Sequence, residues 1–247
     1  MKTLDLNADL GEGMPGDEAL LEIVSSASIA CGGHAGDEET MRASLRAAAA
    51  RGVVVGAHPG FADRENFGRK RLILAPDELD GQVRAQVRRL VEIAEEEGVP
   101  VRYLKLHGAL ANMAAEEPAV AALCFAAVSG LVPDMAVLAI DNSAQVEVAE
   151  TLGYPVLREA YADRAYMPDG LLVPRSMPGA VLHDAAEIAD RAVRLAEAGE
   201  IVAMDGTIIR TEAASLCIHG DTEEAVAIAL AVRGALARAG IAIKAPY

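Results

Sequence analysis

Four of the five histidines in this chain stand at or just after the end of an apolar run. They are His34 in SIACGGHAGD, His58 in VVVGAHP, His107 in RYLKLH and His219 in SLCIHG. If these runs are parallel strands, their carboxyl ends meet at one edge and bring the imidazoles together. Imidazoles grouped with carboxylates can transfer protons or bind a divalent metal ion. His183, the fifth histidine, begins a predicted helix, and we expect it to be a solvated surface group.

Side-chain alternation adds acids and an amine to this group. Along the first predicted strand, Asp5, Asn7 and Asp9 point to one face, and apolar side chains point to the other. Lys105 and His107 share one face of the fourth predicted strand in the same way. Because isolated buried charges are costly, polar side chains that point into a barrel must be paired or bind a ligand. We therefore predict one cluster of Asp9, Lys105 and the histidines, whereas Asp5 lies deeper and is expected to be structural.

Loop residues supply further candidates. Glu12 follows the first strand within LGEG, where a functional role and plain solvation fit the sequence equally well. Arg69, within NFGRK, is either a clamp for a carboxylate or phosphate or a solvated loop charge. Asn7 and Asp63 are additional candidates for substrate binding.

Two glycines precede His34 and account for its position. Gly32 and Gly33 permit a sharp turn and a close approach of the backbone to a ligand, so that His34 projects over the strand ends. Asp37 is the predicted N-cap of the next helix. The first backbone N–H groups of that helix offer a binding place for an anion.

Strand-like and helix-like segments alternate along the chain, which predicts parallel strands joined by helical crossovers. Either a closed barrel or an open doubly wound sheet fits this alternation, but no GxGxxG follows the first strand, which disfavours an open dinucleotide-binding sheet. The length suits a single α/β barrel domain over residues 1–247. The predicted strands are 3–10, 26–31, 53–59, 102–107, 136–140, 155–162 and 215–220, with a hairpin at 201–211. The predicted helices are 17–26, 37–52, 76–97, 143–152, 184–198 and 222–240, and another that begins after Glu116.

Composition excludes several classes of partner. The formal net charge of −15 repels phosphate backbones and anionic lipids, and no Trp is present for base stacking, so we expect no nucleic-acid or membrane binding. The three cysteines are far apart and show neither zinc spacing nor a disulfide framework. Cys217 has no evident cationic activator, which favours core packing over nucleophilic chemistry. With acidic residues near its start and no long apolar run, the chain is predicted to be a soluble cytoplasmic protein.

The residues alone leave two chemistries open. One is metal-assisted hydrolysis with His and Asp ligands, and the other is metal-free acid–base catalysis on a polar substrate. HExxH and short His-x-His pairs are absent, so the metal ligands stay unassigned. The phosphate loop GxxxxGK[ST] is absent too, so a nucleotide site would be of a nonstandard kind.

The order of longer motifs resembles the LamB/YcsF family along nearly the whole chain. Small departures from the family pattern occur at Gly33, at Leu106 and at Glu223–Glu224, and none removes a candidate polar group. The motifs are DLNADLGE (5–12), SIACGGHAGD (28–37), GAHPGFAD (56–63), FGRK (67–70), LKLHGAL (104–110), EAYADRAY (159–166), LVPRSMPGAV (172–181) and CIHGDT (217–222).

This resemblance implies a distorted (β/α)7 TIM-like barrel of the glycoside hydrolase/deacetylase type. It also implies ATP-dependent cleavage of 5-oxo-L-proline (pyroglutamate) to L-glutamate, with ATP and Mg²⁺ as cofactors. The chain would act as the A subunit of 5-oxoprolinase, together with subunits B and C, and could form a homo-oligomer. Backbone amides, Mg²⁺ or a partner would then hold the nucleotide.

Roles for individual residues follow from this resemblance and from their positions. Asp9 and Glu12 would orient the amide and water or ligate Mg²⁺. Lys105 would stabilise developing negative charge, and Arg69 would hold the substrate carboxylate. The four strand-end histidines would shuttle protons and hydrogen-bond the lactam. The alternatives are a stand-alone metal-dependent deacetylase or amidohydrolase acting on C–N bonds, and a non-catalytic subunit that only captures substrate.

Overall fold

Strands and helices alternate along the computed structural model, which describes residues 2–222 and 224–246. Glu223, one of the departures from the family pattern, therefore lies outside the described residues. The strands are β1 (Thr3–Leu10), β2 (Ser26–Ala30), β3 (Val54–His58), β4 (Val101–Leu104), β5 (Ala136–Ile140), β6 (Val156–Tyr161), β7 (Glu200–Val202), β8 (Ile208–Arg210), β9 (Ser215–His219) and β10 (Ala242–Ile243). The helices are α1 (Asp17–Leu21), α2 (Glu38–Arg51), α3 (Pro76–Glu96), α4 (Gly108–Glu116), α5 (Pro118–Val128), α6 (Ala144–Thr151), α7 (Ala185–Ala198) and α8 (Ala225–Arg238).

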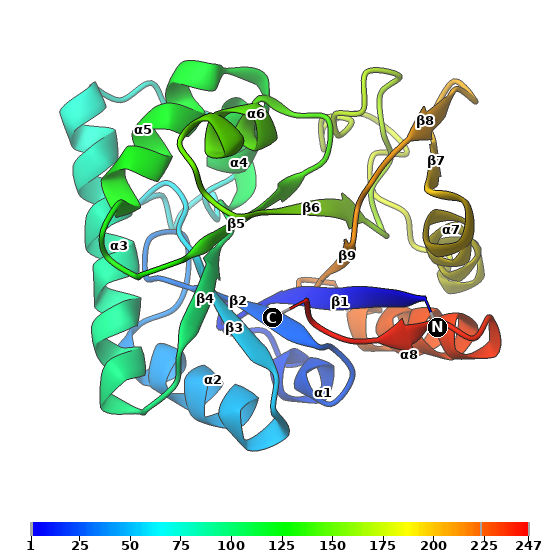
Figure 1. The fold of residues 1–247 in the computed structure, drawn as a ribbon, viewed down its shortest axis with the longest axis horizontal. Coiled ribbons are helices and arrows are strands. Elements are labelled where there is room, and N and C mark those ends of the chain that lie inside the picture. Colours follow the sequence, from blue (N-terminus) through cyan, green and yellow to red (C-terminus); the bar gives the residue numbers. More distant parts are fainter. Residues whose placement is uncertain (1, 223, 247) are drawn as a thin grey trace.

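Within the described residues, seven parallel strands close into a barrel. They follow the order β1–β2–β3–β4–β5–β6–β9, and β9 completes the ring by pairing with β1. Helices such as α2, α3 and α5 lie outside the strands (Figure 1). This architecture confirms the predicted (β/α)7 barrel. The short β10, which the sequence did not predict, pairs in parallel with the start of β1.

Strand register brings the carboxyl ends of β1, β2, β3 and β9 to one end of the barrel. Asp9 of β1 lies opposite Ser28 of β2 and His219 of β9. On the next pair, Ala30 of β2 lies opposite His58 at the end of β3. The predicted meeting of strand-end side chains is therefore a direct result of parallel pairing.

Apolar side chains of the strands point outward and pack under the helices. Leu6 and Leu10 of β1 are fully buried in the main hydrophobic core. Leu45 of α2, Leu90 of α3 and Leu236 of α8 belong to the same core and are equally buried. The alternation that predicted this outward apolar face is thus confirmed, and the opposite face is left for polar groups inside the barrel.

Asp5 anchors a polar layer in the barrel interior below the strand ends. Its carboxylate accepts hydrogen bonds from the hydroxyls of Ser25 at 2.6 Å, Ser26 at 2.7 Å and Ser215 at 2.5 Å. Burial raises the pKa of Asp5, and the hydroxyl hydrogen bonds act in the opposite direction. The carboxyl group of Asp5 on β1 thus links this strand to the beginnings of β2 and β9. This agrees with the structural role expected for Asp5.

The chain after β4 differs from the sequence-based prediction. The strand predicted over 102–107 ends at Leu104, and α4 begins at Gly108. The helix predicted after Glu116 is α5, but the prediction missed α4, in which the Ala-rich segment GALANMAAE is already helical. Pro118 then begins α5 in the first helical turn, where its missing N–H costs nothing.

Barrel geometry nevertheless continues past the end of β4. The backbone N–H of Lys105 donates to the carbonyl of Ala57 at 2.9 Å, and that of His107 donates to the carbonyl of Pro59 at 2.9 Å. These bonds hold the segment alongside β3. Lys105 and His107 therefore keep the inward orientation that alternation predicts, although neither belongs to the strand.

The remaining elements agree with the predicted pattern, except that the helix predicted over 17–26 ends at Leu21. Asp37 caps α2 by accepting a hydrogen bond from the Thr40 N–H at 2.9 Å, so that N–H is occupied and does not serve an anion. Strands β7 and β8 form the predicted antiparallel hairpin. His183 is exposed, as expected. Among the described helices, none has the length and apolar character needed to cross a membrane.

Gly56 of β3 gives a test of packing inside the barrel. A Cβ at this position would lie 2.1 Å from the fully buried Tyr103 ring, so we expect Gly56→Ala to destabilise the protein by about 1–3 kcal/mol through overpacking. Urea unfolding measures the change. Gly81→Ala in α3 is the matched control, because nothing lies within 4 Å of its Cβ, and it should gain up to about 1 kcal/mol. Equal stability of the two variants would contradict the interior packing described here.

Candidate functional site

Lys105 extends into the barrel interior, where polar atoms surround its ammonium. Its Nζ lies 2.9 Å from Asp9 Oδ1 and 2.9 Å from Glu159 Oε1. The same nitrogen donates to Asn7 Oδ1 at 3.2 Å and to Cys217 Sγ at 3.0 Å. The side chains of Lys105, Asp9 and Glu159 are only 2%, 5% and 0% exposed. A buried ammonium thus compensates two buried carboxylates, which come from β1 and β6 on either side of β9.

The charges of this group support one another. Burial alone would raise the pKa of Asp9, but His58 and Lys105 outweigh it and hold that pKa well below its usual value. Burial alone would lower the pKa of Lys105, but Asp9, Cys217 and Glu159 outweigh it and raise that pKa well above its usual value. Asp9 and Lys105 are therefore both charged at neutral pH.

Cys217 is a buried thiol beside this ammonium, although the sequence indicated no cationic neighbour for it. Burial raises the pKa of the thiol well above its usual value, the charge of Asp9 adds to this effect, and Lys105 opposes it. The thiol is neutral as a result. Cys217 therefore has the properties of a packed core residue and not those of a nucleophile.

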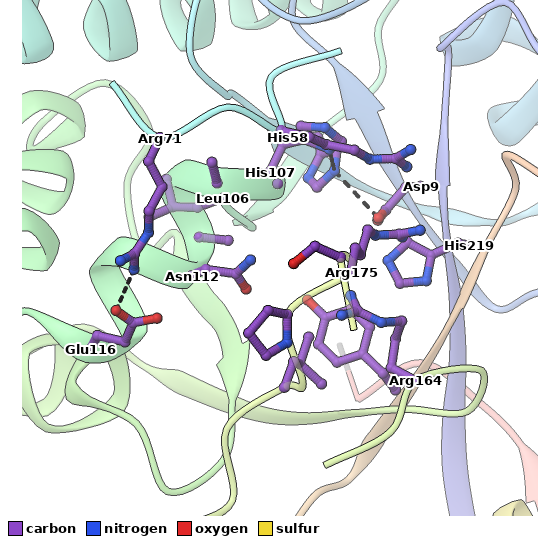
Figure 2. A pocket seen from close by; sticks show the side chains of 18 residues that line it. Asp9, His58, Arg71, Leu106, His107, Asn112, Glu116, Arg164, Arg175 and His219 are labelled. Atoms are coloured by element: carbon purple, nitrogen blue, oxygen red, sulfur yellow. Dashed lines mark hydrogen bonds and ion pairs between the residues drawn. The ribbon is translucent and has the colours of Figure 1, made fainter. Parts of the chain in front are cut away.

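A cavity of about 450 Å³ opens above this group at the carboxyl ends of the strands. Asp9, His58, His107 and His219 line it together with Tyr161. In Figure 2, Asp9 and His219 lie on one side of the cavity, close to Arg175. Such a concave site with several converging polar groups is typical of a small-molecule pocket.

Three imidazoles and a carboxylate form a compact group at one wall of the cavity. The rings of His34 and His107 stack with centroids 3.6 Å apart, and the ring of His58 meets both edge-on. Glu12 Oε1 lies 3.0 Å from His34 Nε2 and 3.5 Å from His107 Nδ1. Ligand atoms of these four residues all lie within 4.8 Å of one another, which is close enough for a shared metal ion.

Burial keeps the imidazoles of His34 and His107 neutral. It lowers the pKa of His34 to about 2 and that of His107 well below its usual value, and neighbouring imidazoles add to both effects. Burial also raises the pKa of Glu12 well above its usual value, with further contributions from Asp9 and Asp221. The group is thus rich in neutral donor atoms.

Glycine makes this close approach of rings possible. Gly68 has φ +62°, and a Cβ there would lie 2.7 Å from His34 Cβ and 3.0 Å from His107 Cδ2. Gly32 and Gly36 flank His34 with φ +86° and +76°. The left-handed backbone at these positions favours glycine, which agrees with the predicted sharp turn before His34.

His219 and Asp163 form a separate acid–base pair. His219 Nδ1 lies 2.9 Å from Asp163 Oδ1, and the His219 backbone N–H also donates to this carboxylate at 3.3 Å. Burial alone would raise the pKa of Asp163, but His219 outweighs it and lowers that pKa. Because an ionised carboxylate only accepts, Nδ1 carries the proton, and Nε2 of the neutral ring is left with a lone pair. This orientation is that of a general base.

Arginines line much of the cavity, although the chain as a whole is strongly acidic. Arg69 forms an ion pair with Asp221, and Arg71 forms one with Glu116 across the cavity from Asp9 (Figure 2). Arg175 also lines the cavity and makes no hydrogen bond or ion pair with any residue that the structure describes. Its guanidinium is therefore available to an anion that enters the cavity.

Arg164 holds the loop that carries Arg175. Its Nε donates to the carbonyl of Ala180 at 3.1 Å, and its Nη2 donates to the carbonyl of Val173 at 2.7 Å. Burial lowers the pKa of Arg164 to about 10. This buried arginine fixes the loop between β6 and α7 from within, and so it positions Arg175 at the cavity.

The structure brings most of the predicted site residues together, and it separates others from the cavity. Asn7 lies beneath it, where its Nδ2 donates to Glu159 and Ser215 at 2.8 Å each. Asp63 accepts a hydrogen bond from Asn66 within its own loop at 2.8 Å and does not line the cavity. The predicted residues that gather at the strand ends are Asp9, Glu12, His34, His58, Arg69, Lys105, His107 and His219.

Sequence reasoning missed several residues of this site. Glu159 and Tyr161 lie on β6, two residues apart. Asp163 lies in the loop after β6, and Arg175 lies further along that loop. All four fall within the motifs EAYADRAY and LVPRSMPGAV, whose individual side chains the sequence pattern did not single out. Alternation along the sixth strand, which places Glu159 and Tyr161 on one face, was the signal that could have found two of them.

Comparison with known sequences agrees with the motif pattern. The sequence profile of the LamB/YcsF family matches residues 4–247. The chain is 45% identical over 253 residues to an A subunit of 5-oxoprolinase from Bradyrhizobium diazoefficiens, covering 100% of this chain and 98% of that protein. It is 45% identical over 249 residues to the A subunit of 5-oxoprolinase from Kocuria rhizophila, covering 99% of both.

Solved structures agree with the barrel. The lactam utilization protein from Thermus thermophilus matches with a TM-score of 0.90 and 38% identity, over 98% of this chain and 99% of that one. A T48 deacetylase matches with a TM-score of 0.52 and 14% identity, over 98% of this chain and 87% of that one. The second likeness concerns the fold alone, and it is consistent with the deacetylase type of barrel predicted.

Removal of the buried ammonium tests the ion pairs beneath the cavity. Lys105→Met leaves two buried carboxylates uncompensated, so we expect a loss of about 3–5 kcal/mol in the free energy of unfolding. In the parent, the pKa of Asp9 is lowered and that of Lys105 is raised, so the pair is charged throughout the neutral range. In the variant, burial without the ammonium raises the pKa of both carboxyl groups, so the loss should grow as the pH rises and these groups ionise. Urea unfolding measures it, with the exposed Lys244→Met as the control.

A double variant separates the ion pair from the volume change. In Lys105→Met with Asp9→Asn, one stranded charge is gone, so the combined loss should be smaller than the sum of the single losses by about 0.5–3 kcal/mol. Strict additivity, or a Lys105→Met variant as stable as the parent, would contradict the pairing.

Proposed function

Because the chain belongs to the LamB/YcsF family, we propose that it is the A subunit of a 5-oxoprolinase that cleaves 5-oxo-L-proline to L-glutamate at the expense of ATP. The curated relatives that are named as A subunits of 5-oxoprolinase support this proposal over essentially the whole chain. The observation that carries it furthest is the cavity, where the unpaired Arg175 lies near the His219–Asp163 pair.

Arg175 binds the carboxylate of the substrate in this proposal. A guanidinium makes paired, charge-assisted hydrogen bonds with a carboxylate, and these are strong where water is excluded. Arg69, the carboxylate clamp predicted from sequence, is already paired with Asp221, so the unpaired Arg175 is the better candidate. Arg69 then contributes positive charge to the same cavity.

His219 moves protons during ring opening. Phosphorylation of the lactam oxygen by ATP makes the ring carbon electrophilic, and water adds to that carbon as His219 Nε2 accepts its proton. The C–N bond then breaks, and the ring nitrogen leaves with the proton that His219 returns. Hydrolysis of the resulting acyl phosphate by a second water yields L-glutamate and phosphate beside ADP. Asp163 holds the ring of His219 in the required tautomer throughout.

Lys105 acts on this reaction through Asp9. The ammonium lies beneath the cavity and not on its wall, so its place differs from the direct oxyanion contact predicted from sequence. It keeps Asp9 ionised and oriented, and Asp9 lines the cavity next to His58. Asp9 then orients the water or the lactam N–H.

Subunits B and C complete the enzyme in this proposal, and ATP enters with Mg²⁺. The described residues include no phosphate loop, and the nucleotide is held by the cavity arginines, backbone amides or a partner. The cationic lining suits phosphate oxygens on a chain whose overall charge is −15.

Reconstitution tests the whole proposal. The chain combined with B and C partners, ATP, Mg²⁺ and 5-oxo-L-proline should produce L-glutamate and ADP together, and omission of the chain should abolish both. Coupled enzymatic assays measure the two products. Glutamate formed at the same rate without ATP would contradict the proposed mechanism.

Arg175→Ala tests carboxylate recognition. Loss of a charge-assisted contact of about 1.5–3 kcal/mol should raise the KM for 5-oxo-L-proline by about 10- to 100-fold. Arg88→Ala is the matched control, since Arg88 is exposed on α3, and its KM should equal that of the parent. Steady-state kinetics of the assembled enzyme measure both. An unchanged KM in Arg175→Ala would exclude this arginine as the carboxylate clamp.

The imidazole group favours a second candidate function, a stand-alone metal-dependent deacetylase or amidohydrolase. Glu12 and three histidines place metal-ligand atoms within 4.8 Å of one another beside the cavity. Activity of the chain alone on an N-acetyl substrate, lost on chelation and independent of ATP, would support this candidate over 5-oxoproline cleavage.

A further inference from the structure

His58 and His107 point two ring nitrogens at each other across 3.0 Å. The opposite nitrogen of each ring is near a backbone carbonyl: His58 Nδ1 lies 2.8 Å from the carbonyl of Lys105, and His107 Nε2 lies 2.9 Å from that of Phe67. Carbonyl oxygens only accept hydrogen bonds, so His58 Nδ1 and His107 Nε2 carry the ring protons. The two nitrogens that face each other, His58 Nε2 and His107 Nδ1, are the ones left to bind a metal ion.

Two ring nitrogens at this separation lie close enough to bind one ion together. A carboxylate and another imidazole stand at the same place. Glu12 Oε1 is 3.5 Å from His107 Nδ1, and His34 Nε2 is 3.0 Å from Glu12 Oε1. One potential ligand atom from each of the four residues thus lies within 4.8 Å of the other three.

From this convergence we infer that His58 Nε2, His107 Nδ1, Glu12 and His34 Nε2 form a binding site for a divalent transition-metal ion such as Zn²⁺. Metal–ligand bonds of about 2.0–2.1 Å in a tetrahedron place neighbouring ligand atoms about 3.3 Å apart. Three of the six separations among these atoms are 3.0, 3.0 and 3.5 Å, close to that value, and all six lie within 4.8 Å.

The donor types select the metal. Imidazole nitrogens suit Zn²⁺, Co²⁺ and similar ions, whereas Mg²⁺ prefers an all-oxygen octahedron and keeps much of its water. The site is therefore distinct from the Mg²⁺ that accompanies ATP. Asp9 Oδ2, at 3.4 Å from His58 Nε2, adds negative charge nearby, although Lys105 already compensates it.

The surroundings resemble those of an established metal site. Ligating histidines usually donate their other ring N–H to a carbonyl or carboxylate, and His58 and His107 both do so. The side chains of His34, His58 and His107 are at most 5% exposed, so the ligands are held firmly. His58 and His107 also line the cavity, which gives an ion a path of entry and places it beside a bound substrate.

Metal titration of the isolated chain tests this site. After chelator treatment and dialysis, the chain is titrated with Co²⁺ and with Zn²⁺ in excess Mg²⁺, and binding is followed by calorimetry and by the visible absorption of Co²⁺. We expect one equivalent per chain, a spectrum with nitrogen ligands, and no displacement by Mg²⁺. His107→Gln and His58→Gln should weaken Co²⁺ binding by more than about tenfold.

Matched variants keep the result unambiguous. The exposed His183→Gln should bind Co²⁺ like the parent, and circular dichroism shows whether each variant is folded. Glu12→Gln, which preserves shape, covers the case in which a histidine variant unfolds, and it should also weaken binding. Absence of saturable binding, or equal binding by all these variants, would overturn the site. Neither ATP nor the B and C partners enter the experiment, so its failure is distinct from failure of the proposed function.

Discussion

The ammonium of Lys105 determines the charge at the carboxyl ends of the strands. It lies 2.9 Å from carboxylates on β1 and on β6, the two strands that flank β9, and both carboxylates are almost fully buried. Without this cation, Asp9 and Glu159 would carry uncompensated charge in a medium of low polarity, or would take up protons. With it, Asp9 stays ionised at the floor of the cavity. The ionised state of Asp9 at the floor of the cavity thus depends on this interaction.

Above that floor, the site divides into two walls of different chemistry. One wall carries the His219–Asp163 pair and Arg175, which is suited to proton transfer beside an anion. The other carries stacked and edge-on imidazoles with Glu12, packed against Gly68 so closely that no side chain fits there. A strongly acidic chain thus presents a cavity with arginine and histidine on its walls. This concentration of positive charge against the overall charge is what an anionic substrate requires.

Alternation and strand order made the barrel and much of the site predictable. The polar face of β1 and the strand-end positions of His58 and His219 follow from a period of two and from parallel pairing. The start of α4 was not predictable in this way, because an alanine-rich segment directly after a strand has no distinct boundary signal. Arg175 was missed because a loop has no periodicity. The buried Arg164 fixes that loop by hydrogen bonds to carbonyls 9 and 16 residues away, which no local pattern indicates. The sequence also does not show which arginines form ion pairs. Arg69, for example, pairs with Asp221, which lies far away in the chain.

A crystal structure of the chain soaked with 5-oxo-L-proline tests most directly whether the cavity is the substrate site. We expect ligand density in the cavity, with the carboxylate against the Arg175 guanidinium and the lactam amide within hydrogen-bonding distance of His219 or Asp9. Ligand bound elsewhere on the chain with an empty cavity, or bound in the cavity without contact to Arg175, His219 or Asp9, would contradict this assignment.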